Sequence, residues 1–142
     1  MNSSADSVAG LLAESLGCLE REAQGCHARM CQHMSGHALD LTIGRQRMSL
    51  RGEPRRLTVG PAHDAPVRVR TELATILAIL GGELPIREAV RDDHLEVQGP
   101  IDRLLILHAA LADYVHGAVR SPSFPALLTR LRSLHQRETG PI

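Results

Sequence analysis

The chain has 142 residues, no tryptophan, one tyrosine and one phenylalanine, and 16 arginines balance 16 acidic residues to a formal net charge of +0. This charge balance and the few aromatic rings argue against nucleic acid as a partner. A protein that binds nucleic acid uses basic patches to contact the phosphates and aromatic side chains to stack on the bases. No stretch approaches the ~18 apolar residues of a membrane-spanning helix, so we expect a cytoplasmic protein. The length predicts a single domain over residues 1–142, frayed at residues 1–6 and 138–142.

The first regular element is a long helical pattern from Ser7 to Met34. Apolar residues recur at helical spacing, but three glycines weaken the pattern, and we expect a break near Gly17 or Gly25. Three strands that alternate apolar and polar residues follow, separated by turn-forming residues, and are predicted to pair antiparallel. Their ranges are Ala38–Gly44, Gln46–Arg51 and Arg56–Val59.

The stretch from Val67 to Gly99 has the clearest signals for where helices and strands begin and end. Its first four residues alternate as a half-buried strand does, and a helix with one leucine-rich face then stops at Gly81-Gly82. Pro85 suits the first turn of a second, short helix. The segment Leu95–Gln98 alternates again and predicts a last strand, which ends at a Gly-Pro pair.

Two helices are predicted after Pro100. The first, from Ile101 to about Val119, is apolar except for a narrow stripe of polar residues: Asp102, Asp113, His116 and Arg120. We expect a helix this apolar to be buried on most sides or to line a cavity. The second is amphipathic and runs from Ala126 to about Gln136. The whole order predicts an α+β fold with one sheet of about five mainly antiparallel strands, covered on one face by helices.

The Val67–Gly99 stretch resembles the sterol carrier protein-2 (SCP-2) domain family. The likeness rests on four features in order: an apolar helix, a Gly-Glu-Leu sequence that ends it, a short helix with an alanine, and a strand that ends in glycine. The residues that carry these features are Leu73, Leu77, Leu80, Gly82, Glu83, Leu84, Ala89, Leu95, Val97 and Gly99. The resemblance implies an apolar tunnel between the sheet and the helices. Its lining would include Leu73, Leu77, Leu80, Leu107, Leu111, Tyr114, Phe124, Leu127 and Leu131, with inward side chains of the sheet.

By this resemblance, the protein would bind, or bind and transfer or present, an apolar or amphipathic small molecule such as a lipid, sterol or polyketide-like compound, without a cofactor. His108 and Tyr114 are the candidates for a polar contact in the tunnel. They would also be the acid–base groups of a second hypothesis, a cofactor-independent cyclase or isomerase. A third hypothesis is an accessory protein, such as a homo-oligomer, with a solid core and an active surface.

The segment from Gly25 to His37 is rich in the residue types that bind zinc or copper. Cys26, His27 and Cys31 are the candidate metal ligands, since His27 and Cys31 would lie one helical turn apart. No second ligand pair follows at a zinc-finger spacing. We therefore favour a packing role for the sulfur-containing side chains and predict no metal site.

Overall fold

The computed structural model describes residues 7–62 and 64–139. Within these ranges the chain forms α1 (Val8–Glu22), α2 (Gln24–Met34), β1 (Ala38–Ile43), β2 (Gln46–Glu53), β3 (Arg56–Gly60), β4 (Val67–Thr71), α3 (Leu73–Leu80), α4 (Ile86–Arg91), β5 (Leu95–Gln98), α5 (Ile101–Arg120) and α6 (Phe124–Thr139). Of the ends predicted to fray, residues 1–6 and 140–142 lie outside the described ranges. None of the described helices is long and apolar enough to cross a membrane.

The five strands form one mixed sheet in the order β3-β2-β1-β4-β5. β1, β2 and β3 form an antiparallel meander, as predicted, and β5 is antiparallel to β4. β1 and β4 are parallel, with Leu41 beside Val69. The chain reaches β4 through residues 61–66, and the backbone N–H of Ala65 in this connection donates to the Asp40 carboxylate (3.2 Å). The predicted α+β fold with a mainly antiparallel sheet is therefore confirmed.

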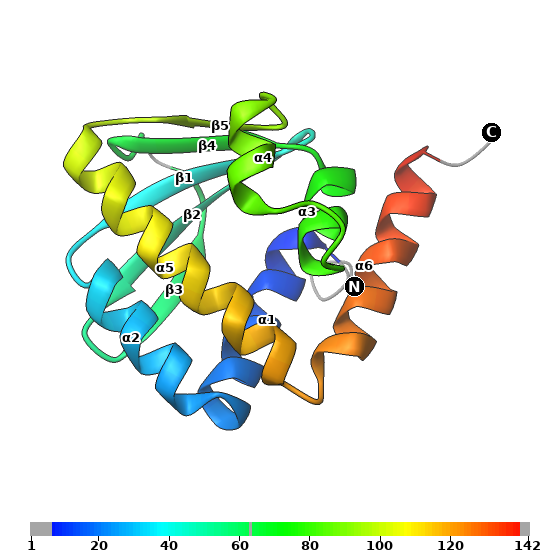
Figure 1. Ribbon diagram of the computed structural model, residues 1–142, viewed down its shortest axis with the longest axis horizontal. Coiled ribbons are helices and arrows are strands. Elements are labelled where there is room, and N and C mark those ends of the chain that lie inside the picture. Colours follow the sequence, from blue (N-terminus) through cyan, green and yellow to red (C-terminus); the bar gives the residue numbers. More distant parts are fainter. Residues whose placement is uncertain (1–6, 63, 140–142) are drawn as a thin grey trace.

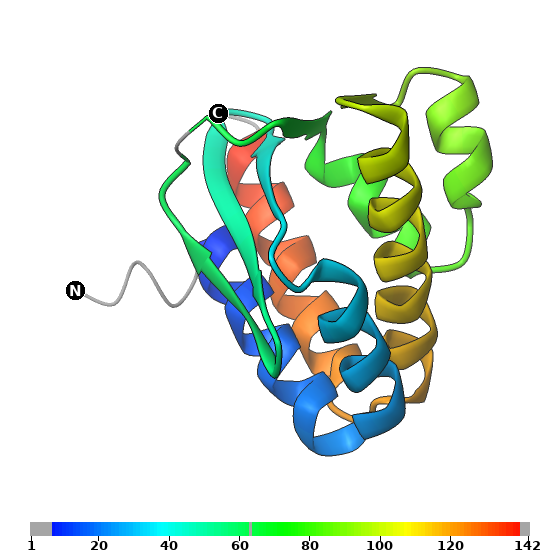
Figure 2. The same ribbon diagram turned by 90° about the vertical axis from the view of Figure 1, so that its left-hand side faces the viewer.

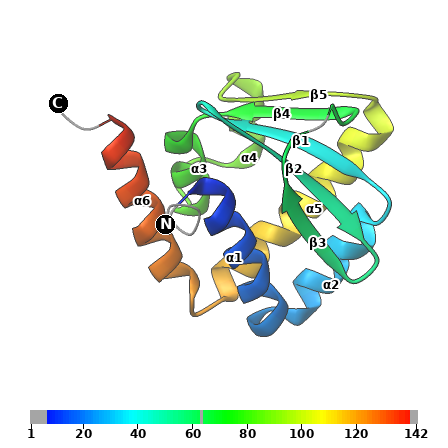
Figure 3. The same ribbon diagram turned by 180° about the vertical axis from the view of Figure 1, so that it is seen from behind.

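The helices cover one face of this sheet. Viewed edge-on, α2, α5 and α4 lie on the same side of the strands, and the view from behind shows the strands with no helix in front of them (Figures 2 and 3). The residue alternation explains this arrangement, because the side chains of Leu39, Leu41 and Ile43 point to the covered face. The open face carries exposed arginines: Arg47, Arg51, Arg68 and Arg70.

The predicted break in the first helical segment falls at Ala23, between the two glycines proposed for it. Ala23 has φ −139° and ψ 60°, while its N–H still donates to the Leu19 carbonyl (2.8 Å). Gly17 stays inside α1 and Gly25 lies in the first turn of α2. A glycine lowers the free-energy cost of interrupting a helix, but the packing of α1 and α2 against the rest of the fold decides where the chain turns.

The structure of α5 differs from a simple division into a polar stripe and a buried apolar remainder. Asp113 of the polar stripe is buried and faces α2, whereas the apolar Ile101, Leu105 and Val119 are 72%, 65% and 78% exposed. The helix packs on α1 and α2 through a face that includes Gly117, where an added Cβ would lie 2.7 Å from Leu19 Cδ2 of α1 and 3.3 Å from Cys26 Cβ of α2. Helical spacing identified the stripe of residues, but charged partners on α2 turned part of it inward.

Candidate functional site

An apolar cavity of about 370 Å³ lies between the sheet and the helices. This volume is toward the lower end of the range of about 300–1,000 Å³ that is common for small-molecule sites. The inner face of the sheet forms one wall, α1 and α2 close one side, and α3, α4, α5 and α6 form the rest (Figure 1). Long aliphatic side chains dominate this lining, and it contains no Asp, Glu or Arg among the described residues.

The structure brings together most of the residues that the sequence nominated for the site. Among the nominated residues, those that line the cavity are Leu73, Leu80, Leu107, His108, Leu111, Tyr114, Phe124, Leu127 and Leu131. Leu77 packs against the core from α3 instead. Sequence reasoning missed the contribution of the N-terminal helices, which supply Val8, Leu11, Leu12, Ser15, Leu16, Met30 and Met34. Their apolar spacing was visible, but nothing local indicates that two helices so early in the chain reach the cavity.

Two residues of the cavity lining are themselves exposed to solvent, one on α4 and one on α5. They are Val90, which is 44% exposed, and His108. Where a wall residue is this exposed, only its own side chain separates the cavity from solvent. We call the region of Val90 and His108 the mouth. His108 is therefore a group at the mouth, whereas Tyr114 lies further along α5.

Tyr114 and Ser15 form the main polar pair in the cavity wall. Their hydroxyl oxygens are 2.6 Å apart, and the Ser15 hydroxyl donates to the Leu12 carbonyl (2.7 Å), which makes Tyr114 the donor to Ser15. Burial raises the pKa of Tyr114 to about 12 even though the hydrogen bond with Ser15 opposes the shift. The Tyr114 ring also meets Phe124 edge-on, with ring centroids 5.9 Å apart. Tyr114 is thus a fixed, neutral hydroxyl group at neutral pH.

A second hydroxyl group of the lining is likewise tied to the protein. Thr71 donates its hydroxyl hydrogen to the His94 carbonyl (2.9 Å). Polar groups that are already paired offer little to a charged ligand, because a carboxylate or phosphate in an apolar cavity needs strong donors or a cation. The wall therefore favours the hydrocarbon part of a ligand over a charged group.

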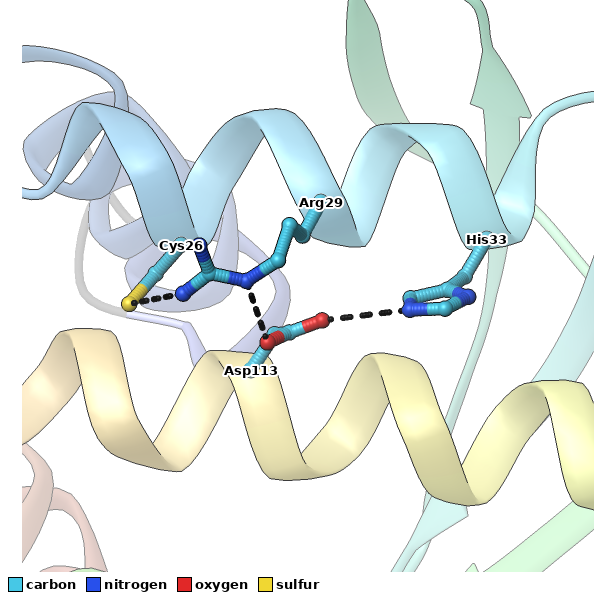
Figure 4. Close-up of polar contacts among 4 residues, drawn as sticks. All are labelled: Cys26, Arg29, His33 and Asp113. Carbon is cyan, nitrogen blue, oxygen red and sulfur yellow. Dashed lines mark hydrogen bonds and ion pairs between the residues drawn. The ribbon is translucent and has the colours of Figure 1, made fainter.

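The cysteine- and histidine-rich segment forms α2, and its polar contacts hold α2 to α5 (Figure 4). The buried Asp113 carboxylate accepts from Arg29 Nε (3.2 Å) and lies 3.5 Å from His33 Nε2, so one carboxylate bridges two turns of α2. A further contact of 3.5 Å joins Arg29 to the Cys26 sulfur. Removing Asp113 would leave two partners that are largely solvated, since Arg29 and His33 are both exposed.

The candidate metal ligands are not gathered at one point. His27 and Cys31 are neighbours, with a ring nitrogen 3.7 Å from the Cys31 sulfur, whereas Cys26 contacts Arg29. Burial raises the pKa of the Cys31 thiol, which disfavours the thiolate that a metal requires. Within residues 7–62 and 64–139, no three His, Cys, Asp or Glu side chains are placed to hold a metal ion together.

Comparison with known proteins locates the fold. No protein-family model matches the sequence, and a search of curated proteins finds no match. A crystal structure of sterol carrier protein 2 aligns with a TM-score of 0.53 and 18% identity, over 77% of this chain and 96% of that chain. The solution structure of sterol carrier protein domain 2 of Helicoverpa armigera aligns with a TM-score of 0.51 and 10% identity, over 69% and 80% of the two chains. The fold of this protein is SCP-2-like, as the Val67–Gly99 stretch predicted.

Proposed function

We propose that this protein binds an apolar or amphipathic small molecule, such as a lipid, sterol or polyketide-like compound, in the cavity between the sheet and the helices. The observation that carries the proposal is the cavity itself, whose wall is aliphatic and whose hydroxyl groups have protein partners. Burial of apolar ligand surface there would contribute about 25 cal/mol per Å². The polar end of an amphipathic ligand would lie at the mouth, by Val90 and His108.

The likeness to sterol carrier protein 2 supports the same class of ligand. At 18% identity, the likeness shows the fold alone. The ligand of this chain therefore has to be identified by a binding measurement. An enzyme working in the same cavity would need His108 or Tyr114 to move a proton. Tyr114 is neutral and donates to Ser15, and His108 is exposed at the mouth, so no specific contact favours that alternative.

A cavity-filling substitution tests the proposal. Leu128 lines the cavity from α6, and Ala126 is exposed on the same helix. We expect the unaltered protein to bind a fluorescent fatty acid (cis-parinaric acid) or a fluorescent sterol (dehydroergosterol). Leu128→Trp should weaken binding at least tenfold, because the indole occupies space that the ligand needs, and the matched control Ala126→Trp should bind normally.

Two results would count against this function. One is a folded unaltered protein that binds neither probe and carries no lipid when purified from cells and analysed by native mass spectrometry. The other is a Leu128→Trp variant that binds the probes as tightly as the unaltered protein. Circular dichroism of every variant separates loss of the site from loss of the fold.

A further inference from the structure

The outer side of α5 carries a regular, largely apolar repeat whose two ends are exposed. The described residues include four large apolar side chains that are exposed. Three of them lie on this helix: Ile101, Leu105 and Val119. The same line along the helix includes the exposed His108 and the half-buried Ala112 and Val115. We call these six residues the α5 seam. Figure 1 shows α5 crossing the front of the molecule with no element passing over it.

The spacing of the seam is that of a coiled coil. Ile101, His108 and Val115 are separated by seven residues, as are Leu105, Ala112 and Val119, so the steps alternate between four and three. A repeat of 3.5 residues keeps one narrow line facing a partner helix, whereas a helix that lies on a bilayer presents a broader apolar face. The seam runs for 19 residues, from Ile101 to Val119, and the 18 steps between these ends correspond to roughly 27 Å of helix.

We infer that α5 pairs antiparallel with α5 of a second copy of this chain across a two-fold axis. Such a pairing stacks large residues on small ones, with Ile101 opposite Val119, Leu105 opposite Val115 and His108 opposite Ala112 of the other copy. Each layer occurs twice, because a two-fold interface is built from the same surface on both subunits. The crossing angle is that of left-handed coiled coils, about +20°.

Polar side chains beside the seam support this arrangement. Asp102 and His116 lie on the same flank of the seam near opposite ends, and both are exposed. In the antiparallel pair, Asp102 of each copy lies near His116 of the other, where the imidazole can donate a hydrogen bond to the carboxylate. In a parallel pair the two flanks lie on opposite sides of the interface, so this contact is lost. Polar pairs at flanking positions set the orientation of a helix pair more than its strength. His108 and Val115 of the seam also line the cavity, as do the neighbouring Leu104 and Leu111, so the second copy would lie over the mouth.

Sedimentation velocity tests the pairing. We expect the unaltered protein to sediment, as its concentration rises, toward twice the 15.4 kDa of the chain. Leu105→Asp and Val119→Asp should each raise the dimer dissociation constant at least tenfold, because each would bury a carboxylate against apolar residues. Ala126→Asp, which changes an exposed apolar residue of α6, should dimerise normally. The two seam side chains are largely exposed, so both variants should keep the circular dichroism spectrum of the fold.

Orientation is tested by mild oxidation. A protein carrying both His108→Cys and Ala112→Cys should form disulfide-linked dimers, while His108→Cys alone should not, because position 108 faces 112 in the antiparallel pair. Monomeric behaviour of the unaltered protein at every concentration would overturn the inference, as would efficient cross-linking of the single variant. A monomer that floats with phosphatidylcholine vesicles only when Leu105 is intact would assign the seam to a membrane instead. Ligand binding by the same variants is measured separately, because His108 belongs to both the seam and the mouth.

Discussion

At the scale of single residues, the polar groups in and beside the cavity wall are paired with protein atoms, whereas the buried Ser49 hydroxyl group of β2 has no hydrogen-bond partner among the described residues. Tyr114 donates to Ser15, Thr71 donates to the His94 carbonyl, and Asp113 is held by Arg29 and His33. Unpaired, each group would cost about 1–3 kcal/mol or more of folding free energy. Because these hydroxyl groups are already hydrogen-bonded, the interior of the cavity wall offers a ligand few strong hydrogen-bond donors. An apolar ligand is therefore favoured over a charged one.

The ionisation of Tyr114 provides a test at this scale. It is the one tyrosine of a chain that has no tryptophan, so the absorbance of tyrosinate reports it alone. We expect its pKa to be about 12 in the folded protein, against an ordinary value near 10. Between these values only the unfolded chain ionises, so the free energy of unfolding is unaffected by Tyr114 below pH 10 and falls as the pH rises toward 12.

The measurement is a spectrophotometric titration, with circular dichroism to detect unfolding at each pH. Tyr114→Phe serves as the control and should show no tyrosinate signal while it stays folded. Ionisation near pH 10 in a protein that keeps its native spectrum would contradict the burial of the hydroxyl group.

At the scale of elements, close backbone contacts determine how the helices sit on the sheet. The end of α2 meets β2 so closely that a Cβ on Gly52 would lie 1.9 Å from the Met34 carbonyl oxygen. Hydrogen bonds join the same segments, from Gly36 N–H to the Gly52 carbonyl (3.1 Å) and from Gly52 N–H to the His37 carbonyl (2.9 Å). A glycine is needed here for space, because both contacting groups are backbone and neither can move aside.

Gly52→Ala should therefore lower the free energy of unfolding by at least about 1–3 kcal/mol, the usual range for overpacking. Gly60→Ala is the matched control on the adjacent strand, since nothing lies within 4 Å of a Cβ there. Urea denaturation of both variants measures the difference. Equal midpoints for the two would show that α2 and β2 do not approach as closely as described.

At the scale of the whole molecule, the two sides of the cavity differ in how firmly they are packed. α2 and α5 hold each other through buried residues and the Asp113 contacts, and α1 packs against α2. On the other side, α4 has six residues and buries only Ala89 among them. This helix also carries Val90 at the mouth, so the less firmly packed side is the one where the cavity opens.

Hydrogen exchange should reflect this difference. We expect the amides of α4 to exchange much faster than those of α2, because local opening costs least where few apolar contacts are lost. A bound probe such as dehydroergosterol should slow exchange in α4 more than in α2. Uniform protection across the two helices would indicate that the mouth is as rigid as the rest of the fold.

The sequence by itself determined the local structure of this protein and nine of the residues that line the cavity. Alternation predicted all five strands, and glycines marked the end of α3. These signals are local, since each depends on residues within a few positions of one another. The resemblance of the Val67–Gly99 stretch to the SCP-2 family indicated the fold and led to ten nominated cavity residues, of which nine line the cavity.

Only the tertiary structure decided the remaining features. The parallel pairing of β1 with β4, the inward turn of Asp113 and the part of α1 and α2 in the cavity wall all depend on residues far apart in the chain. Whether an apolar side chain of α5 faces the cavity or solvent follows from which neighbours reach it, and helical spacing alone does not contain that information. The cavity and the exposed seam are therefore properties of the packing, because the same apolar helix could have been covered on every side.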